Sequence, residues 1–326
     1  MNKRSMLLVL ILAALALSVA VVIVYFNHQY NDYNLQGKLV FAKTFDAGSK
    51  VDKIVVTTAE DSVELVQRNS YWLIVNRGGY YADFQLMHRF LSSVNKSIYS
   101  VKLPYKTETL QQGYLFDPRQ EKQDSGMLIQ TYAGQKLLDE VIVGLPNPDE
   151  HYFFARRPQD KAIWLIDGDF DLPVYSRHWL LRPVLSVSER GVESITSDGK
   201  HAQRDDSAGS FTDDQGRKAD VAPLLNVLQA VYAVDVQPEA VFKEKYGDQL
   251  AEPKVIDVIT FYGLEFICRL YTGLEGRVWL NVNLSTTPLP ISSVNDYIRD
   301  NRFLYDGWYF EISPEQRHVL RNFRLM

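Results

Sequence analysis

One pattern of landmarks occurs twice in this chain of 326 residues, in 51–173 and again in 192–312. Each copy opens with a short β-branched segment, continues to an aromatic residue, and reaches a glycine three residues before an Ala-Asp pair. Two later glycines, at 134 and 144, recur at 263 and 273, an offset of 129 residues in both cases. A constant offset at two glycines is hard to obtain by chance, so the sequence predicts two related folding units. Without a catalytic signature, such a duplication favours binding or assembly.

Each copy predicts an α+β unit, an antiparallel-rich sheet with one main helix packed on it. Short turns join the apolar segments, and hairpin connections imply antiparallel pairing. The expected strands are 53–57, 62–66, 72–75, 127–131, 138–143, 152–155 and 162–166 in the first copy, and 255–261, 265–271, 277–282 and 308–312 in the second. Residues 198–218 are weakly apolar and predict a long exposed loop in place of the second hairpin. Residues 172–188 predict a connector helix between the copies.

The main helix of each copy is expected to begin at an aspartate, Asp83 or Asp220, whose side chain caps the first turn. Apolar residues then recur every three or four positions, which places one stripe on a helix. The stripe residues are Phe84, Met87, Leu91, Val94 and Ile98 in the first copy, and Val221, Leu224, Leu228 and Tyr232 in the second. Each copy also predicts a short helix that ends at a glycine, over 107–112 and 238–246.

The N-terminal segment predicts a membrane anchor. Residues 6–26 are apolar apart from Ser18, and about 20 helical residues cross a bilayer. Lys3 and Arg4 precede this segment and the next basic residue is Lys38, so the N-terminus is expected in the cytoplasm. A signal peptide cleaved after Ala20 is the alternative. The expected organisation is a cytoplasmic tip (1–5), a transmembrane anchor (6–26), a juxtamembrane tether (27–50), a first unit (51–173), a connector (174–191) and a second unit (192–326).

Charge and cysteine content exclude two classes of protein. The formal net charge is −5, whereas nucleic-acid binding needs clustered positive charge, so no nucleic-acid partner is expected. Cys268 is the only cysteine, so no intrachain disulfide can form. Its position inside an apolar strand pattern favours a role as core filler. We therefore expect the fold to be held together by core burial.

The order of these landmarks resembles the domain-of-unknown-function 4340 family. The resemblance includes the Gly-x-x-Ala-Asp element before a helix, then Gly113-Tyr114-Leu115-x-x-Pro118, Val143-Gly144 and the closing segment 307–312. The second copy departs from the pattern at Tyr246-Gly247-Asp248-Gln249. The resemblance implies a bacterial inner-membrane protein with most of its chain in the periplasm. It also implies an accessory role in gliding-motility-type ABC transport systems, with protein partners and no catalytic residues.

No motif for a hydrolase elbow, a P-loop or a dinucleotide site occurs, so we expect no catalytic residue, cofactor or metal. The segment Asp167-Gly168-Asp169-Phe170-Asp171 resembles the start of a calcium loop, but Leu172 and His178 stand where that loop needs glycine and glutamate. The alternative interpretation is an acidic turn after a strand.

Aromatic residues supply the candidate contact sites. They could stack on sugars or anchor a partner, and they could equally belong to the sheet core. The candidates are Tyr80, Tyr81, Tyr152, Phe154 and Trp308. The expected function is a non-enzymatic, membrane-tethered scaffold or accessory subunit of an ABC-type transport or envelope complex. The alternatives are a glycan- or lipid-binding envelope module and an envelope hydrolase, whose carboxylates (Asp167, Asp169 and Glu265) would have to converge in a cleft.

Overall fold

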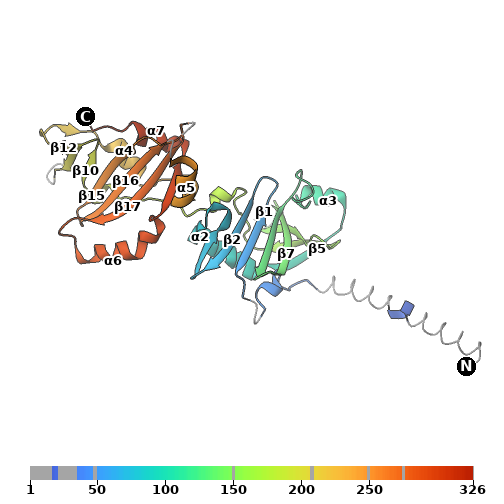
Figure 1. Cartoon of the computed structure of the whole chain (residues 1–326). Coiled ribbons are helices and arrows are strands. Elements are labelled where there is room, and N and C mark those ends of the chain that lie inside the picture. Colours follow the sequence, from blue (N-terminus) through green and yellow to red (C-terminus); the bar gives the residue numbers. More distant parts are fainter. Residues whose placement is uncertain are drawn as a thin grey trace, which may run out of the picture. The chain divides into compact units, whose positions relative to one another are not determined.

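The computed structural model of the chain describes residues 17–20, 35–46, 50–148, 151–205, 209–247, 250–273 and 276–325 (Figure 1). Of the anchor expected over 6–26, only 17–20 fall within the described residues, and the rest lies outside them. Within the described part of the chain, no helix is both long enough and apolar enough to cross a membrane.

The described chain forms two nine-stranded antiparallel sheets with a few short helices. The strands of the first sheet are β1 (Lys53–Thr57), β2 (Ser62–Arg68), β3 (Tyr71–Ile74), β4 (Tyr80–Tyr81), β5 (Ile98–Leu103), β6 (Met127–Ala133), β7 (Lys136–Pro146), β8 (Tyr152–Arg156) and β9 (Ile163–Asp167). Those of the second are β10 (Val192–Ser197), β11 (Lys200–Arg204), β12 (Phe211–Asp213), β13 (Lys218–Ala219), β14 (Ala233–Pro238), β15 (Lys254–Thr260), β16 (Leu264–Thr272), β17 (Val278–Thr286) and β18 (Trp308–Ile312). The prediction of two antiparallel-rich sheets is confirmed.

The two sheets share one strand order. The first runs β4-β3-β2-β1-β6-β7-β8-β9-β5, and the second runs β13-β12-β11-β10-β15-β16-β17-β18-β14. Every strand of the second sheet therefore takes the place of the strand nine numbers earlier. The helices follow the same plan, because α2 (Phe84–Lys96) and α4 (Ala222–Leu228) follow β4 and β13. Likewise, α3 (Thr107–Gln112) and α5 (Glu239–Tyr246) follow β5 and β14.

Two further helices belong to the second sheet's part of the chain, α6 (Ser292–Asn301) and α7 (Pro314–Asn322). By compactness, the described chain divides into two units. The first unit contains the residues up to Ser62 together with His88–Val174, and the second contains Val63–Met87 together with the chain from Tyr175 onward.

Helix α2 begins as the sequence predicts, but its buried face is rotated. The Leu86 amide donates a hydrogen bond of 2.8 Å to Oδ1 of Asp83, which is the expected capping bond. Met87 and Val94 are buried as predicted, and Leu86 and Phe90 are buried beside them, whereas Phe84 is exposed. The stripe predicted to begin at Phe84 is therefore wrong at its first position, because Leu86 and Phe90 fill the core.

Helix α4 departs from its expected cap. Val221 occupies the N-cap position and no side chain caps the helix, so Asp220 does not form the expected bond. Leu224, Leu225 and Leu228 are buried, and Tyr232 is exposed. The apolar face of this short helix ends at Leu228.

Two expected segments, a loop and a connector helix, have a different structure. The exposed loop predicted over 198–218 is wrong, because β11 and β12 pair there as an antiparallel hairpin. The connector predicted as a helix over 172–188 contains only a 3-10 turn over Ser176–Trp179. Trp179 is almost fully buried in the second unit, so this connector is part of a core.

The segment expected as a tether folds onto the first unit. A 3-10 turn covers Ala42–Thr44, and Val40 and Phe41 are fully buried. Arg157 donates a hydrogen bond of 2.7 Å to the Val40 carbonyl. The described residues 35–46 are therefore an integral part of this unit and not a free linker.

Two glycines of the first unit meet backbone to backbone. A Cβ at Gly144 would lie 1.7 Å from the carbonyl oxygen of Gly113, and the Leu145 amide donates to that same oxygen at 3.0 Å. The glycines at the related positions of the second unit, Gly247 and Gly273, have no comparable contact. This contact explains the glycine at position 144, whereas the Phe154 ring, 2.9 Å from a Cβ at Gly113, explains the glycine at position 113.

Candidate functional site

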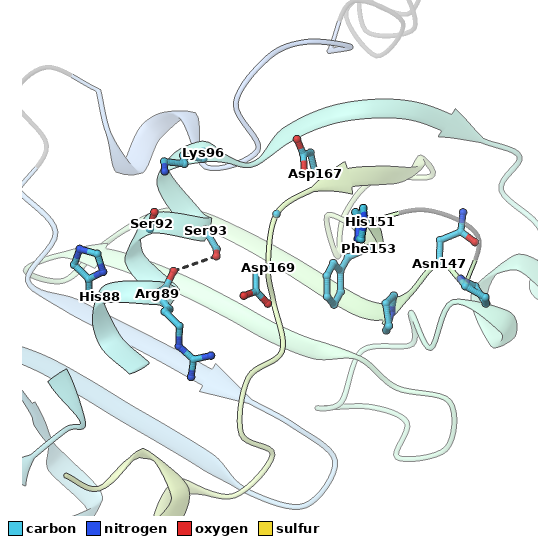
Figure 2. Close-up of a pocket in the computed structure, with 13 residues that line it drawn as sticks. His88, Arg89, Ser92, Ser93, Lys96, Asn147, His151, Phe153, Asp167 and Asp169 are labelled. Carbon is cyan, nitrogen blue, oxygen red and sulfur yellow. Dashed lines mark hydrogen bonds between the residues drawn. The ribbon is translucent and has the colours of Figure 1, made fainter. Parts of the chain in front are cut away.

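The first unit contains an open pocket of about 910 Å³. Three segments line it: one face of α2, the end of β7 with the start of β8, and the turn after β9 (Figure 2). The lining residues are His88, Arg89, Ser92, Ser93, Lys96, Pro146, Asn147, Pro148, His151, Phe153, Asp167, Gly168 and Asp169. We refer to it as the polar pocket.

Helix α2 supplies the basic side of the polar pocket. His88, Ser92 and Lys96 recur every four residues, so they lie on one face of the helix. Arg89 and Ser93 lie beside them, and Ser93 Oγ donates to the Arg89 carbonyl at 3.1 Å (Figure 2). Because the opposite face of α2 fills the core, this polar face is held toward the pocket.

A glycine turn supplies the acidic side. Gly168 has φ of 152°, and a Cβ there would lie 2.6 Å from the Phe170 ring. Glycine is therefore required between the two carboxylates. The Asp171 amide donates to Asp169 Oδ1 at 3.3 Å, which steadies the turn. Asp167 and Asp169 consequently both line the polar pocket.

An aromatic row anchors this turn in the first unit. Phe170 is buried, and its ring centroid lies 5.8 Å from that of Phe153 and 6.3 Å from that of Phe41. Phe153 also lines the polar pocket, so one of its surfaces is apolar. The docked N-terminal segment thus supports the acidic turn through Phe41.

The polar pocket combines charges of both signs with an aromatic surface. In Figure 2, the α2 side chains lie on one side, His151, Phe153 and Asn147 on the other, and Asp169 between them. The ion pairs among the described residues do not involve Arg89, Lys96, Asp167 or Asp169. The polar pocket therefore offers hydrogen-bond donors and acceptors beside an apolar ring surface.

Three of the aromatic candidates come together in the second unit. The Tyr80 ring centroid lies 5.6 Å from that of Tyr81 and 5.0 Å from that of Trp308. Tyr80 is fully buried, its hydroxyl donates to the Leu304 carbonyl at 3.2 Å, and burial raises the pKa of Tyr80. A partner cannot reach Tyr80 in this structure, so its role is packing. Tyr81 and Trp308 are half-buried.

The other two aromatic candidates lie on β8 of the first unit. Phe154 packs against the core cluster that contains Leu115 and Ile163, and a Cβ at Gly113 would lie 2.9 Å from its ring. Tyr152 is half-buried. Neither lines the polar pocket, whereas their neighbour Phe153 does. Alternation along the strand explains this difference, because successive side chains point to opposite faces.

The carboxylates considered for a hydrolase belong to two different units. Asp167 and Asp169 line the polar pocket, but Glu265 lies on β16 in the second unit and is not part of that lining. Among the described residues, no group of three His, Cys, Asp or Glu side chains could hold a metal ion. Cys268 is buried on β16, and burial raises the pKa of its thiol to about 12.

The sequence did not point to the basic residues of this site. Three of them, His88, Arg89 and Lys96, lie on the polar face of one helix, where charged residues are ordinary. The fourth, His151, lies far from them along the chain. The available signal was the acidic turn at Asp167 and Asp169. No protein-family model matches the chain, and comparison with curated proteins and with solved structures finds no similar protein.

Proposed function

We propose that this chain is a non-enzymatic, membrane-tethered protein of the bacterial periplasm. Its role is that of a scaffold or accessory subunit of an ABC-type transport or envelope complex. The observation that supports this proposal most is the shared order of the two nine-stranded sheets. Two sheets with the same strand order present two related surfaces, and such a pair of surfaces is suited to binding partner proteins.

We also propose that the two sheets descend from one duplicated unit. Equal strand order, helices at corresponding places and the constant glycine offset support this origin. The two copies have diverged, since only the second carries α6 and α7 and only the first has the glycine contact among the described residues. Divergence of this kind is expected where two copies take different partners.

Affinity purification tests the assembly role. The full-length chain is recovered from its own membranes in mild detergent, and the proteins recovered with it are identified by mass spectrometry. Stoichiometric recovery of transporter subunits is expected. A control chain whose segment 6–26 is replaced by an unrelated membrane helix should recover the same subunits. Recovery of the chain alone from both preparations would overturn the proposal.

The polar pocket favours a second candidate function, the binding of an envelope glycan. Carboxylates, an amide and basic groups around Phe153 offer a sugar both hydrogen bonds and an apolar surface. Titration calorimetry of the full-length protein with soluble cell-wall glycan fragments tests this candidate. Asp169→Asn should weaken binding by about 1 kcal/mol or more.

The matched control for that titration is Asn95→Ala. Asn95 is an exposed residue of α2 that does not line the polar pocket. This variant should bind glycan as the unaltered chain does. Equal binding by all three proteins would place any glycan elsewhere, and no binding by any of them would remove the candidate.

A further inference from the structure

The second unit contains a pocket of different character, with a volume of about 410 Å³. None of its lining residues carries a charged side chain. They are Ser186, Val187, Ser188, Gly191, Thr260, Tyr262, Leu264, Phe266, Ile291, Ser293, Val294 and Tyr297. The volume lies within the range of about 300–1,000 Å³ that is usual for ligand pockets. We refer to it as the apolar pocket.

The apolar pocket depends on an insertion in the second sheet. Residues 287–307 connect β17 to β18 and contain α6, whereas 157–162 connect the corresponding strands β8 and β9 of the first sheet. Ile291, Ser293, Val294 and Tyr297 reach the pocket from this insertion. The first sheet has no helix at this place, so the apolar pocket is an addition to the shared plan.

The insertion is fastened to the β15–β16 turn by backbone contacts. The Thr287 amide donates to the Gly263 carbonyl at 2.9 Å, and the Ile291 amide donates to the Tyr262 carbonyl at 3.0 Å. Gly263 has φ of 81°, and a Cβ there would lie 2.7 Å from Cα of Pro290. These contacts make the wall of the apolar pocket part of the fold.

The interior of the apolar pocket is apolar and its mouth carries hydroxyl groups. Val187, Phe266 and Val294 are buried side chains of the lining, whereas Ser188 and Ser293 are exposed. An ionised head group would find no opposite charge among these lining residues, and burying an unpaired charge is costly. The chemistry therefore selects a ligand with an apolar body and an uncharged polar end.

An exposed apolar surface continues outward from the apolar pocket. Tyr262 and Ile291 line the pocket and are also exposed, and Leu289 beside them is 93% exposed. Contiguous exposed apolar residues of this kind mark contact with lipids or partners. An apolar chain that enters the pocket could therefore first lie on this surface.

We propose that the apolar pocket binds the acyl chain of an uncharged lipid, with the exposed serines facing its polar end. The proposal uses only contacts within the second unit, and it stands apart from the assembly role and from the glycan candidate. It accounts for the insertion, the uncharged lining and the exposed apolar surface together.

Photolabelling in membranes tests the proposal. A monoacylglycerol that carries a diazirine on its acyl chain is added to membranes containing the full-length protein, and labelled tryptic peptides are mapped. Labelling should concentrate in peptides 255–269 and 278–299, which carry the turn and α6. Excess unlabelled monoacylglycerol should remove the label, and glycerol should not.

Two tryptophan variants of α6 provide the matched comparison. Ser293→Trp fills the mouth of the apolar pocket and should reduce labelling about tenfold or more. Asn295→Trp lies on the same helix, is exposed and does not line the pocket, so it should label normally. Ser188→Trp blocks the opposite wall and serves if Ser293→Trp has a lowered melting temperature. Equal labelling of all variants, or label spread evenly over the chain, would overturn the proposal.

Discussion

Thr44 donates two hydrogen bonds to the same oxygen of Asp139, one from its amide and one from its hydroxyl, each 2.8 Å long. The Asp139 side chain is fully buried, and its other oxygen accepts from Arg157 at 3.1 Å. Thr44 lies on the docked N-terminal segment and Asp139 lies on β7. One buried carboxylate therefore fastens this segment to the middle of the first sheet.

Removal of that carboxylate should be strongly destabilising. Asp139→Ala leaves the Arg157 guanidinium and two Thr44 donors without their partner, which should cost about 3 kcal/mol or more. Thr44→Val removes the hydroxyl, which bonds both Asp139 Oδ2 and Thr131 Oγ1, but keeps the amide bond, and should cost about 1–2 kcal/mol. Denaturant unfolding of the full-length variants measures both values. Trypsin should also cut faster after Lys38 and Lys43 in Asp139→Ala.

The control for this comparison is Asp46→Ala, since Asp46 lies in the same segment but is exposed. Its unfolding and its cleavage should match those of the unaltered chain. If Asp139→Ala is cut no faster than Asp46→Ala, the segment is not held by this carboxylate.

Alanine should have very different effects on stability at two related glycines. Gly144→Ala drives a methyl group into the Gly113 carbonyl and should destabilise the fold by about 3 kcal/mol or more. Gly273→Ala meets its nearest atom at 3.8 Å and should change stability by less than about 1 kcal/mol. Thermal unfolding distinguishes the two variants. Similar losses in both would show that the backbone contact does not determine the residue at position 144.

Tyr80 should behave as a core residue. Tyr80→Ala empties a fully buried site beside Trp308 and Phe310 and should cost about 3–5 kcal/mol. Tyr80→Phe keeps the ring and loses only the hydroxyl bond to the Leu304 carbonyl, so about 1 kcal/mol is expected. Melting curves decide this prediction. A variant that loses partner recovery at an unchanged melting temperature would instead support a contact role.

The Cys268 thiol should be unreactive in the folded chain. It is buried, and burial raises its pKa to about 12, so almost none is ionised at pH 8. A thiol-reactive dye should therefore label the native protein slowly and should label one thiol per chain after unfolding in denaturant. Rapid labelling of the native protein would contradict this placement.

The same thiol should make stability depend on alkaline pH. In the unfolded chain a cysteine ionises near pH 8.5, whereas the folded thiol stays protonated up to about 12. Its contribution is complete below pH ~8.5 and is lost as the pH rises from there, by up to about 1.4 kcal/mol per pH unit. The free energy of unfolding should thus fall more steeply between pH 8 and 10 for the unaltered chain than for Cys268→Ala. Parallel curves would show that this thiol is not responsible.

Elements that are bounded by turn residues and have a regular spacing of apolar residues could be predicted from the sequence. The β18 range agrees with its expectation at both ends, and α3 covers the predicted 107–112. Strands β5 and β14 were missed, because each follows a helix or an irregular segment and pairs with a strand distant in sequence. Such long-range pairing leaves no local pattern.

The errors have physical causes that only tertiary contacts reveal. The hairpin of β11 and β12 looks like a loop because few of its residues are buried, yet Ala202 and Phe211 reach the core. Phe84 fits a helical stripe, but Leu86 and Phe90 occupy the buried face of α2. The spacing of apolar residues predicts that a helix forms better than it predicts which side of the helix is buried.

The polar pocket could be predicted only in part. The acidic residues on either side of Gly168 stood out because they form a dense run, whereas His88 and Arg89 lie on an ordinary polar helix face. Convergence of α2 with the ends of β7 and β9 depends on the complete sheet order. A single sequence carries no sign of that convergence.

The backbone contact between Gly113 and Gly144 also bears on how the two halves can change over evolutionary time. In the first half, a side chain at position 144 would meet the Gly113 carbonyl and one at position 113 would meet the Phe154 ring, so both positions are expected to stay glycine. Gly247 and Gly273 are free of that restriction. New surface features should therefore accumulate faster in the second half, where the helix-bearing insertion between β17 and β18 is found.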